Sequence, residues 1–424
     1  MTRPGYKMAE IGEIPEEWEV VEMGDNKVSE LVMGQSPPSS SYNTSGKGIP
    51  FLQGNADFGE IYPTPSIYCT KPLKVAEKGD ILLSVRAPVG ELNIAAFKCI
   101  IGRGLAAIRC KDKKTHYRYL YYYLKHTVKR LRHLSTGSTF KAVGKDILSH
   151  FEICLPDFEE QQKIAEILSS TDKAIQRVND QITKTERLKK GLMQTLLTKG
   201  IGHTNFKMTE IGEIPEEWSI KPISECSVPV SGIDPSIFGR SYFKYIDVSG
   251  ISSEELAIVD TKEIQGVSAP SRARKEVKEE DVIFATVRPY LKRVAIVPKY
   301  LDSQVCSTAF CVIRANRNEI MPRFLYYYMT FDKFVSKISG FQMGSAYPAV
   351  SDNLVMSERI AIPKIYEQQK IAEILSDIDS YLGGLGNYKA KLNSLKKGLM
   401  QDLLTGKVRV NNLKGVLNIN GNTV

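Results

Sequence analysis

The sequence lacks the segments that mark membrane-spanning and exported proteins. No apolar run approaches the roughly 20 residues that a membrane helix needs, and residues 1–7 contain no apolar core of a signal peptide. The seven cysteines are odd in number and no two form a C-x-x-C pair, which argues against a disulfide framework and against a zinc ribbon. We therefore expect a cytoplasmic protein, without a membrane partner, whose thiols are free and buried.

The common motifs of nucleotide and metal chemistry are also missing. There is no G-x-x-x-x-G-K-[ST] phosphate loop and no G-x-G-x-x-G fingerprint opening a βαβ unit. Only five histidines are present, all before residue 204, and they lack neighbouring acid or cysteine ligands at metal-binding spacing. The sequence therefore predicts neither a bound cofactor nor a metal site.

What remains is an ordinary globular composition with a basic excess. The 424 residues are 42% hydrophobic and 25% charged, which suits two to four domains with proper cores. Lysine and arginine number 57 against 48 acidic residues, giving a formal charge of +9. This excess permits a polyanionic partner without establishing one.

The chain is an internal repeat. Residues 7–18 read KMAEIGEIPEEW, and residues 207–218 read KMTEIGEIPEEW. The ten letters EQQKIAEILS occupy 160–169 and again 367–376, and LKKGLMQ occupies 188–194 and 395–401. Between these matched segments the two copies have drifted apart. We expect matched segments to meet the same partner twice and the divergent bodies to meet different ones.

Each matched C-terminal segment is predicted to be a long helix. Apolar residues follow a spacing of three and four from Ile164 to Leu196 and from Ile371 to Leu403, which is typical of a coiled-coil seam. Each helix covers about 40 residues, or roughly 60 Å. The first helix ends near the start of the second copy, so the second helix can run back antiparallel along it and hold two bodies apart. The alternative is that each helix packs only on its own body.

The fold class expected is mixed α/β (α+β), with two globular domains and a two-helix coiled coil. Residues 81–86 and 282–288 read as equivalent strands that end at Arg86 and Arg288. The predicted division is 1–156 and 201–363 for the globular domains, with 157–200 and 364–424 for the helices and the tail. Trp18 and Trp218 are expected to be core anchors, because both lie in matched segments.

Basic residues are the candidates for DNA contact. Ten cations and one acid lie between Lys111 and Lys145, many of them on a predicted helix with an apolar stripe from Tyr117 to Leu131. Two interpretations of the helix cations are open, namely phosphate binding and an ordinary solvated face. For the arginines that end the two strands, the two interpretations are guanine recognition and a structural ion pair. Two Gly-Ser turns, 137–138 and 344–345, offer further donors to phosphate. The candidate residues are Arg86, Lys125, Lys129, Arg130, Arg132, Ser138, Lys141, Lys145, Arg272, Arg274, Arg288, Lys292, Arg293 and Ser345.

The repeated motifs resemble a known family. IGEIPEEW at 11–18 and 211–218, GDILLS at 79–84, EQQKIAEIL at 160–168 and 367–375, and LKKGLMQ closing each copy are similar to the specificity subunit of type I restriction–modification enzymes. The resemblance covers the whole chain. It implies two target-recognition domains, each reading one half of a split site in double-stranded DNA.

The same resemblance implies the partners and the absence of catalysis. The conserved helices would set the spacer and dock two methyltransferase subunits, restriction subunits would join that core, and this chain would carry no catalytic residue. A stand-alone two-lobed DNA-binding regulator is the main alternative, and an independent enzyme is a weaker one. Two unlike bodies suit an asymmetric site, because a palindrome needs equivalent readers.

Overall fold

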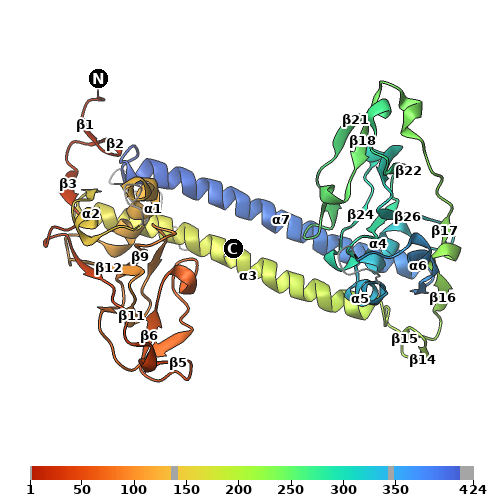
Figure 1. The fold of residues 1–424 in the computed structure, drawn as a ribbon, viewed down its shortest axis with the longest axis horizontal. Helices are drawn as coiled ribbons and strands as arrows, with labels where there is room; N and C mark the ends of the chain where they lie inside the picture. Colours follow the sequence, from red (N-terminus) through yellow and green to blue (C-terminus); the bar gives the residue numbers. More distant parts are fainter. Residues whose placement is uncertain (1, 135–141, 342–347, 411–424) are drawn as a thin grey trace, which may run out of the picture. The chain divides into compact units, whose positions relative to one another are not determined.

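The computed structural model describes residues 2–134, 142–341 and 348–410. Its contacts divide the chain into two units. Unit 1 joins Met1–Asn179 to Asn387–Val424, and unit 2 is Asp180–Gly386. The globular part of unit 1 lies before the first long helix and is called body 1 here. The globular part of unit 2 lies between the two long helices in the sequence and is called body 2 (Figure 1).

Body 1 contains two sheets and two small antiparallel pairs. One sheet has the strand order β10-β9-β12-β4, which are Leu92–Ile94, Ile81–Ser84, Leu105–Cys110 and Ser29–Met33. The other has the order β5-β7-β6-β11-β8, which are Tyr42–Asn43, Ile67–Cys69, Ile49–Leu52, Cys99–Ile101 and Val75–Ala76. The pairs are β1 with β2, Tyr6–Ala9 and Gly12–Pro15, and β3 with β13, Glu19–Glu22 and Glu152–Leu155.

Helix α1, Tyr117–Leu134, fills the core of unit 1, and the short helix α2, Lys145–Ser149, follows it in sequence. The predicted apolar stripe is present, but Tyr119, Tyr122 and Tyr123 are buried as well. Their burial follows from what covers the other faces of the helix. The Tyr119 hydroxyl donates to the Cys154 carbonyl of β13 at 2.7 Å, and the Tyr122 hydroxyl donates to Asp172 at 2.6 Å.

Body 2 has two four-stranded sheets. One has the strand order β17-β26-β23-β24, which are Ser227–Val228, Phe310–Ala315, Val282–Ala285 and Val294–Ile296. The other has the order β21-β18-β25-β22, which are Lys262–Gln265, Tyr242–Ile246, Gln304–Ser307 and Ala273–Val277. Three small pairs accompany these sheets. They are β14 (Phe206–Thr209) with β15 (Gly212–Pro215), β16 (Ser219–Pro222) with β27 (Arg359–Ile362), and β19 (Ile251–Ser252) with β20 (Ala257–Ile258). Its helices are α4, Pro322–Thr330, α5, Asp332–Gly340, and α6, Asp352–Ser357.

The two divergent bodies share one topology. In each, the strand after the GD or ED turn lies between the same two neighbours, β9 between β10 and β12, and β23 between β24 and β26. The second sheets also correspond, because β6 pairs in parallel with β11 as β18 does with β25. Body 1 adds the strand β5. Body 2 splits the long aromatic helix into two nine-residue helices at the extended residue Phe331.

The acid at the start of the equivalent central strands has the same role in both bodies. Asp80 and Asp281 are buried, and each accepts two hydrogen bonds from an arginine on the neighbouring strand. Arg109 donates to Asp80 at 3.1 and 2.8 Å, and Arg314 donates to Asp281 at 2.9 and 2.8 Å. These bonds raise the pKa of both guanidiniums. The bidentate pair fixes the end of the sheet opposite to the one where Arg86 and Arg288 lie.

The long helices have the predicted lengths. Helix α3, Phe158–Leu196, has 39 residues, and α7, Ile365–Leu404, has 40 and runs without a break through the three glycines between 383 and 386. Helix α3 begins in unit 1 and ends in unit 2, while α7 begins in unit 2 and ends in unit 1. Each unit therefore contains parts of both helices in an antiparallel sense, as predicted. The alternative, in which each helix packs only on its own body, is wrong.

Candidate nucleic-acid interface

A buried tyrosine, a buried aspartate and a half-buried lysine join the body to both helices in unit 1. Asp172 on α3 is 5% exposed, accepts from the Tyr122 hydroxyl of α1 and pairs with the Lys396 ammonium of α7. That ammonium also lies 5.8 Å from the centre of the Tyr122 ring. Burial, followed by the hydrogen bond to Asp172, raises the pKa of Tyr122 well above its usual range. Three elements therefore meet at one carboxylate.

Unit 2 has the same arrangement with the helices exchanged. Asp379 on α7 accepts from the Tyr327 hydroxyl of α4 at 2.8 Å and pairs with Lys189 of α3 at 2.5 Å. The side chain of Asp379 is 34% exposed, against 4% for that of Asp172. The two triads fix how each body sits on its own part of the helix pair, and the triad of unit 2 is the more accessible to water.

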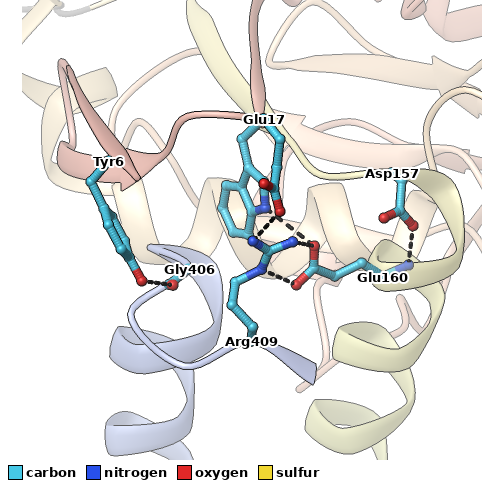
Figure 2. A network of polar contacts seen from close by, with 7 residues as sticks. Tyr6, Glu17, Asp157, Glu160, Gly406 and Arg409 are labelled. Carbon is cyan, nitrogen blue, oxygen red and sulfur yellow. Dashed lines mark hydrogen bonds and ion pairs between the residues drawn. The ribbon is translucent and has the colours of Figure 1, made fainter. Parts of the chain in front are cut away.

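A second contact that recurs in both units lies, in unit 1, at the start of α3 and is drawn in Figure 2. The Trp18 indole N–H donates to Glu160 at 3.2 Å, and the Arg409 guanidinium donates to both oxygens of that carboxylate at 2.8 Å. Arg409 also pairs with Glu17, and its pKa is raised chiefly by the hydrogen bond to Glu160. The segment after α7 thus closes onto the matched N-terminal motif of the same unit.

The equivalent contact in unit 2 uses a histidine. Glu367 accepts from the Trp218 indole N–H at 3.0 Å and from the Ile201 backbone N–H at 2.9 Å, and it contacts His203 Nε2 at 2.9 Å. Both tryptophans are 1% exposed, so they are core anchors, as predicted. The repeated letters of the tryptophan and glutamate motifs therefore serve contacts inside each unit.

The repeated glutamine after each of these glutamates has the same kind of role. Gln161 and Gln368 are both buried. The Gln161 side chain accepts from the backbone N–H of His116 at 2.8 Å and donates to the backbone carbonyls of Lys114 and Pro156. The Gln368 side chain likewise accepts from the backbone N–H of Met321 and donates to the backbone carbonyls of Glu319 and Pro363. The matched EQQ motif thus ties the start of each long helix to the start of the aromatic helix of its body.

Arg86 and Arg288 lie just beyond the equivalent strands, rather than at their ends as expected. Strand β9 ends at Ser84 and β23 at Ala285, because each chain then bends away to meet the segment that precedes α2 or α6. Arg86 forms an isolated bridge with Ala142, and Val287 forms one with Ala349. Both arginine side chains are exposed, and among the described residues neither has a hydrogen bond or ion pair. Within the part of the chain that the structure describes, neither arginine therefore forms the structural ion pair considered as the alternative.

The loop after β23 has a strained backbone. Arg288 and Lys292 both have φ of 50° and flank a 3-10 turn, Pro289–Leu291. Left-handed conformations cost roughly 1–2 kcal/mol for a residue with a Cβ atom, so neighbouring contacts must hold this loop. Lys292 pairs with Asp332, which also pairs with Lys190 of α3 at 3.0 Å. These two ammonium groups, Lys292 first, lower the pKa of Asp332.

The cations of α1 do not form one free face. Lys129 is exposed, and among the described residues its side chain has no polar partner. Arg130 instead pairs with Glu10 and lies 4.7 Å from the Phe151 ring, and burial lowers its pKa. Arg132 donates to the Val89 carbonyl and to Glu91, each at 2.9 Å, so it holds the loop that Arg86 begins. Lys125 donates to the Tyr121 hydroxyl at 3.3 Å.

The remaining DNA-contact candidates fall into three groups. Some have polar partners within the protein, some are exposed, and some lie outside the described residues. Arg293 donates to the Val248 carbonyl at 3.1 Å, and Arg274 lies 3.9 Å from Asp234. Arg272 is exposed, and Lys145 is exposed at the first position of α2. Three candidates lie outside the described residues, namely Ser138, Lys141 and Ser345.

The turn between the two sheets brings further residues to the end of each body that carries Arg86 or Arg288. In body 1 the Val85 N–H donates to the Gly104 carbonyl, which places exposed Arg103 beside Arg86. In body 2 the Thr286 N–H donates to the Ala309 carbonyl, and the Thr308 N–H donates to the Arg272 carbonyl, each at 2.8 Å. We call these the loop ends of the bodies. They gather exposed arginines that have no side-chain partner among the described residues, as a phosphate-binding surface requires.

Sequence reasoning missed three residues here. Arg103 was overlooked because it stands alone between two apolar strands, and Tyr290 because a single tyrosine in a loop carries no periodic signal. The role of Asp332 could not be predicted, because it depends on its ion pairs with Lys292 and Lys190, which are distant in sequence. The one available signal was RPYLKR at 288–293, where an aromatic residue lies among cations.

Metal binding requires grouped ligands, and membrane insertion requires a long apolar helix. Among residues 2–134, 142–341 and 348–410, no group of three histidine, cysteine or acidic side chains is placed to hold a metal ion. No helix of that part of the chain is long and apolar enough to span a bilayer. All seven cysteines are free; Cys110 is half-buried and the other six are buried.

Comparison with known proteins connects this architecture to one family. The family model described as "Type I restriction modification DNA specificity domain" matches residues 15–187 and 242–394. The putative MjaX specificity subunit of a type I restriction enzyme from Methanocaldococcus jannaschii is 50% identical over 193 residues, 46% of this chain and 45% of that protein. The MjaVIII specificity subunit of the same organism is 28% identical over 94% of this chain and 95% of its own length.

A solved structure gives the same fold over nearly the full chain. The S subunit of a type I restriction–modification system from M. genitalium matches with a TM-score of 0.59 at 16% identity, covering 95% of this chain and 99% of that one. The chain thus spans about half the length of the MjaX relative but nearly all of two others. Since the family model matches both copies of the repeat, the chain belongs to the type I restriction–modification DNA specificity family, with two specificity domains.

Proposed function

We propose that this chain is the DNA-recognition subunit of a type I restriction–modification complex. Each body reads one half of an asymmetric bipartite site, and the chain acts in the cytoplasm on double-stranded DNA. The observation that carries the proposal is that two bodies of one topology expose different residues at equivalent loop ends, Arg86 and Arg103 in one and Arg272, Arg288 and Tyr290 in the other. A shared scaffold with unlike loops suits two unlike half-sites.

A body exchange tests this reading. Replacing residues 20–150 with the body of a related subunit should change one half of the methylated motif and leave the other half unchanged. The readout is the methylated motif, sequenced from cells that carry the hybrid together with its methyltransferase. A change in both halves, or in neither, would contradict independent reading.

The partners form the second part of the proposal. We infer that two methyltransferase subunits and the restriction subunits dock on the long helices, and that this chain contributes no catalytic group. Purified chain incubated with DNA, S-adenosylmethionine, magnesium and ATP should then leave the DNA unmodified, and the tagged chain should co-purify with a methyltransferase. A stand-alone regulator would bind DNA without that partner.

The helices are also proposed to set the gap between the half-sites. One heptad inserted into each helix keeps both seams in register and adds about 10 Å at 1.5 Å per residue. At about 3.4 Å per base pair, this equals nearly three base pairs, and DNA bending absorbs part of it. The gap should lengthen by about one to three base pairs with both half-sites unchanged. An unchanged gap in a folded, active variant would assign the spacing to the partner subunits.

A further inference from the structure

The loop Arg288–Lys292 is an exposed segment of body 2 whose backbone is held by several contacts. Both of its flanking residues have left-handed backbones, as given above, and glycine is absent from it. Such a conformation persists only where the surroundings impose it. Here the Arg288 N–H donates to the Pro348 carbonyl at 2.8 Å, the Lys292 N–H donates to the Pro289 carbonyl at 2.9 Å, and Pro289 itself is buried.

A charged cluster completes the hold on this loop. Asp332 is the first residue of α5, where a carboxylate also favours the helix dipole. One of its oxygens pairs with Lys292, and the other pairs with Lys190 at 3.0 Å. The carboxylate therefore joins the end of the strained loop to helix α3 within unit 2. No carboxylate joins the corresponding loop of unit 1 to a long helix in the described residues, where Arg132 of α1 holds Val89 instead.

The loop exposes three side chains, those of Arg288, Tyr290 and Leu291. Tyr290 is 50% exposed, Leu291 is 36% exposed, and the Arg288 guanidinium points to solvent. In the described part of the chain, no hydrogen bond, ion pair or ring contact involves the side chain of Tyr290 or Arg288. A rigid backbone thus presents an apolar tip beside an unpaired cation. The corresponding loop of body 1, residues 86–90, contains no aromatic residue.

We propose that Tyr290 contacts a nucleotide of the half-site read by body 2, and that Asp332 is the positioning residue that fixes its loop. The contact is through the ring, against a thymine methyl group, because the tip is apolar through Leu291 as well. Arg288 supplies the neighbouring contact to phosphate. This inference rests on the proposed function.

The test uses the full chain co-expressed with its methyltransferase subunits, and it scores base preference at each position of the methylated motif. Tyr290→Ala should lower base discrimination at one or two positions of one half-site by roughly tenfold. Tyr290→Phe should stay within about twofold, because the ring is retained. Tyr242→Ala is the matched control, since this tyrosine is 63% exposed in body 2 but lies at the start of β18, away from the loop. Its motif should equal that of the wild type.

The role of Asp332 is tested by base discrimination at individual motif positions, because a general loss of stability would not change which bases are preferred. Asp332→Asn should lower discrimination at the same positions as Tyr290→Ala, Asp332→Glu should restore part of it, and the double variant should be no worse than Tyr290→Ala alone. Glu319→Gln, which removes a 2.6 Å pair with Lys221 elsewhere in body 2, controls for the loss of an ion pair. It should leave the motif unchanged.

The outcomes separate this inference from the proposed function. A wild-type complex that methylates no bipartite motif would overturn the proposed function. A wild type with a clear motif that is unchanged in Tyr290→Ala would overturn the contact, and equal losses in the alanine and phenylalanine variants would overturn its assignment to the ring. If losses from Tyr290→Ala and Asp332→Asn simply add, Asp332 does not act through the loop.

Discussion

The two units use nearly the same side-chain contacts between body and long helices, but they differ in the residues exposed at their loop ends. Tyr122, Asp172 and Lys396 in unit 1 correspond to Tyr327, Asp379 and Lys189 in unit 2, and each tryptophan finds its glutamate. At the loop ends, by contrast, one body exposes Arg86 and Arg103, and the other exposes Arg288 and Tyr290. Contacts that fix a body on its helices are thus retained in both copies, while the surface proposed to read DNA has diverged.

Even the shared contacts differ in how well they are shielded. Glu160 is fully buried and is held by an arginine, whereas the Glu367 side chain is 15% exposed and is held by a histidine and a backbone N–H. Asp172 and Asp379 differ in the same direction. Because the cost of a lost partner grows with the burial of the charge left behind, unit 1 should suffer more from equivalent changes.

The largest effect is expected at Arg409. Among the described residues, Arg409→Ala leaves the buried Glu160 carboxylate with the Trp18 N–H as its one side-chain partner. The free energy of unfolding of unit 1 should therefore fall by about 3–5 kcal/mol. His203→Ala should cost unit 2 only about 1 kcal/mol, because Glu367 keeps two donors. The measurement is urea unfolding followed by hydrogen exchange in each unit.

A surface pair serves as the control for Arg409. Arg3 is 50% exposed and pairs with Glu13 at 2.9 Å, so Arg3→Ala should change stability by less than about 1 kcal/mol. Equal losses for Arg409→Ala and His203→Ala would show that burial does not distinguish the two units.

The triads give the next largest difference. Asp172→Ala removes the acceptor of the Tyr122 hydroxyl and the counter-ion of Lys396, and should lower the stability of unit 1 by about 2–3 kcal/mol. Asp379→Ala should cost unit 2 about 1 kcal/mol, since water replaces more of what is lost. Exposed Asp377, two residues away, gives the matched control, and Asp377→Ala should stay within about 0.5 kcal/mol. A larger loss in unit 2 than in unit 1 would reverse the comparison.

The sequence predicted the architecture better than the surface. Self-comparison located the repeat, the seams and both long helices, because these depend on periodicity along the chain. It also showed that the EQQKIAEILS motif is repeated, but it gave no partner for the Glu160 side chain. The contact with Arg409, 249 residues away, depends on how the chain closes. The division at 156, 200 and 363 stays a prediction.

Individual site residues were harder to predict, because a cation in a sequence does not reveal its neighbours. Lys129 and Arg130 are adjacent on α1, yet one faces solvent and the other packs on Phe151. Arg132, expected to bind phosphate, holds a loop in the described structure, and its contact with DNA stays a prediction. Which arginines remain unpaired is decided by acids far away in sequence, as the pairing of Arg314 with Asp281 shows.

Salt dependence of DNA binding sharpens the contrast between adjacent cations and is the next effect in size. Lys129→Gln in unit 1 and Arg272→Gln in unit 2 should each reduce the slope of log K against log salt by about one, because each removes one phosphate contact. Arg130→Gln should leave the slope unchanged and lower stability instead. The measurement is fluorescence-detected DNA binding by the complex between about 50 and 200 mM salt. An unchanged slope in Lys129→Gln would assign that lysine to the solvated surface.

The smallest effect concerns cysteine labelling, and it compares the same sheet in the two bodies. Burial raises the pKa of Cys110 in β12 and of Cys311 in β26 to about 12, so both thiols stay protonated at pH 8. Cys110 is half-buried at the end of its strand, whereas Cys311 is 1% exposed within its strand. A thiol reagent at pH 8 should therefore modify Cys110 before Cys311, and both far more slowly than in the urea-unfolded chain. Mass spectrometry of peptides from a labelling time course gives the order, and earlier labelling of Cys311 would mean that the sheet of body 2 opens more readily than that of body 1.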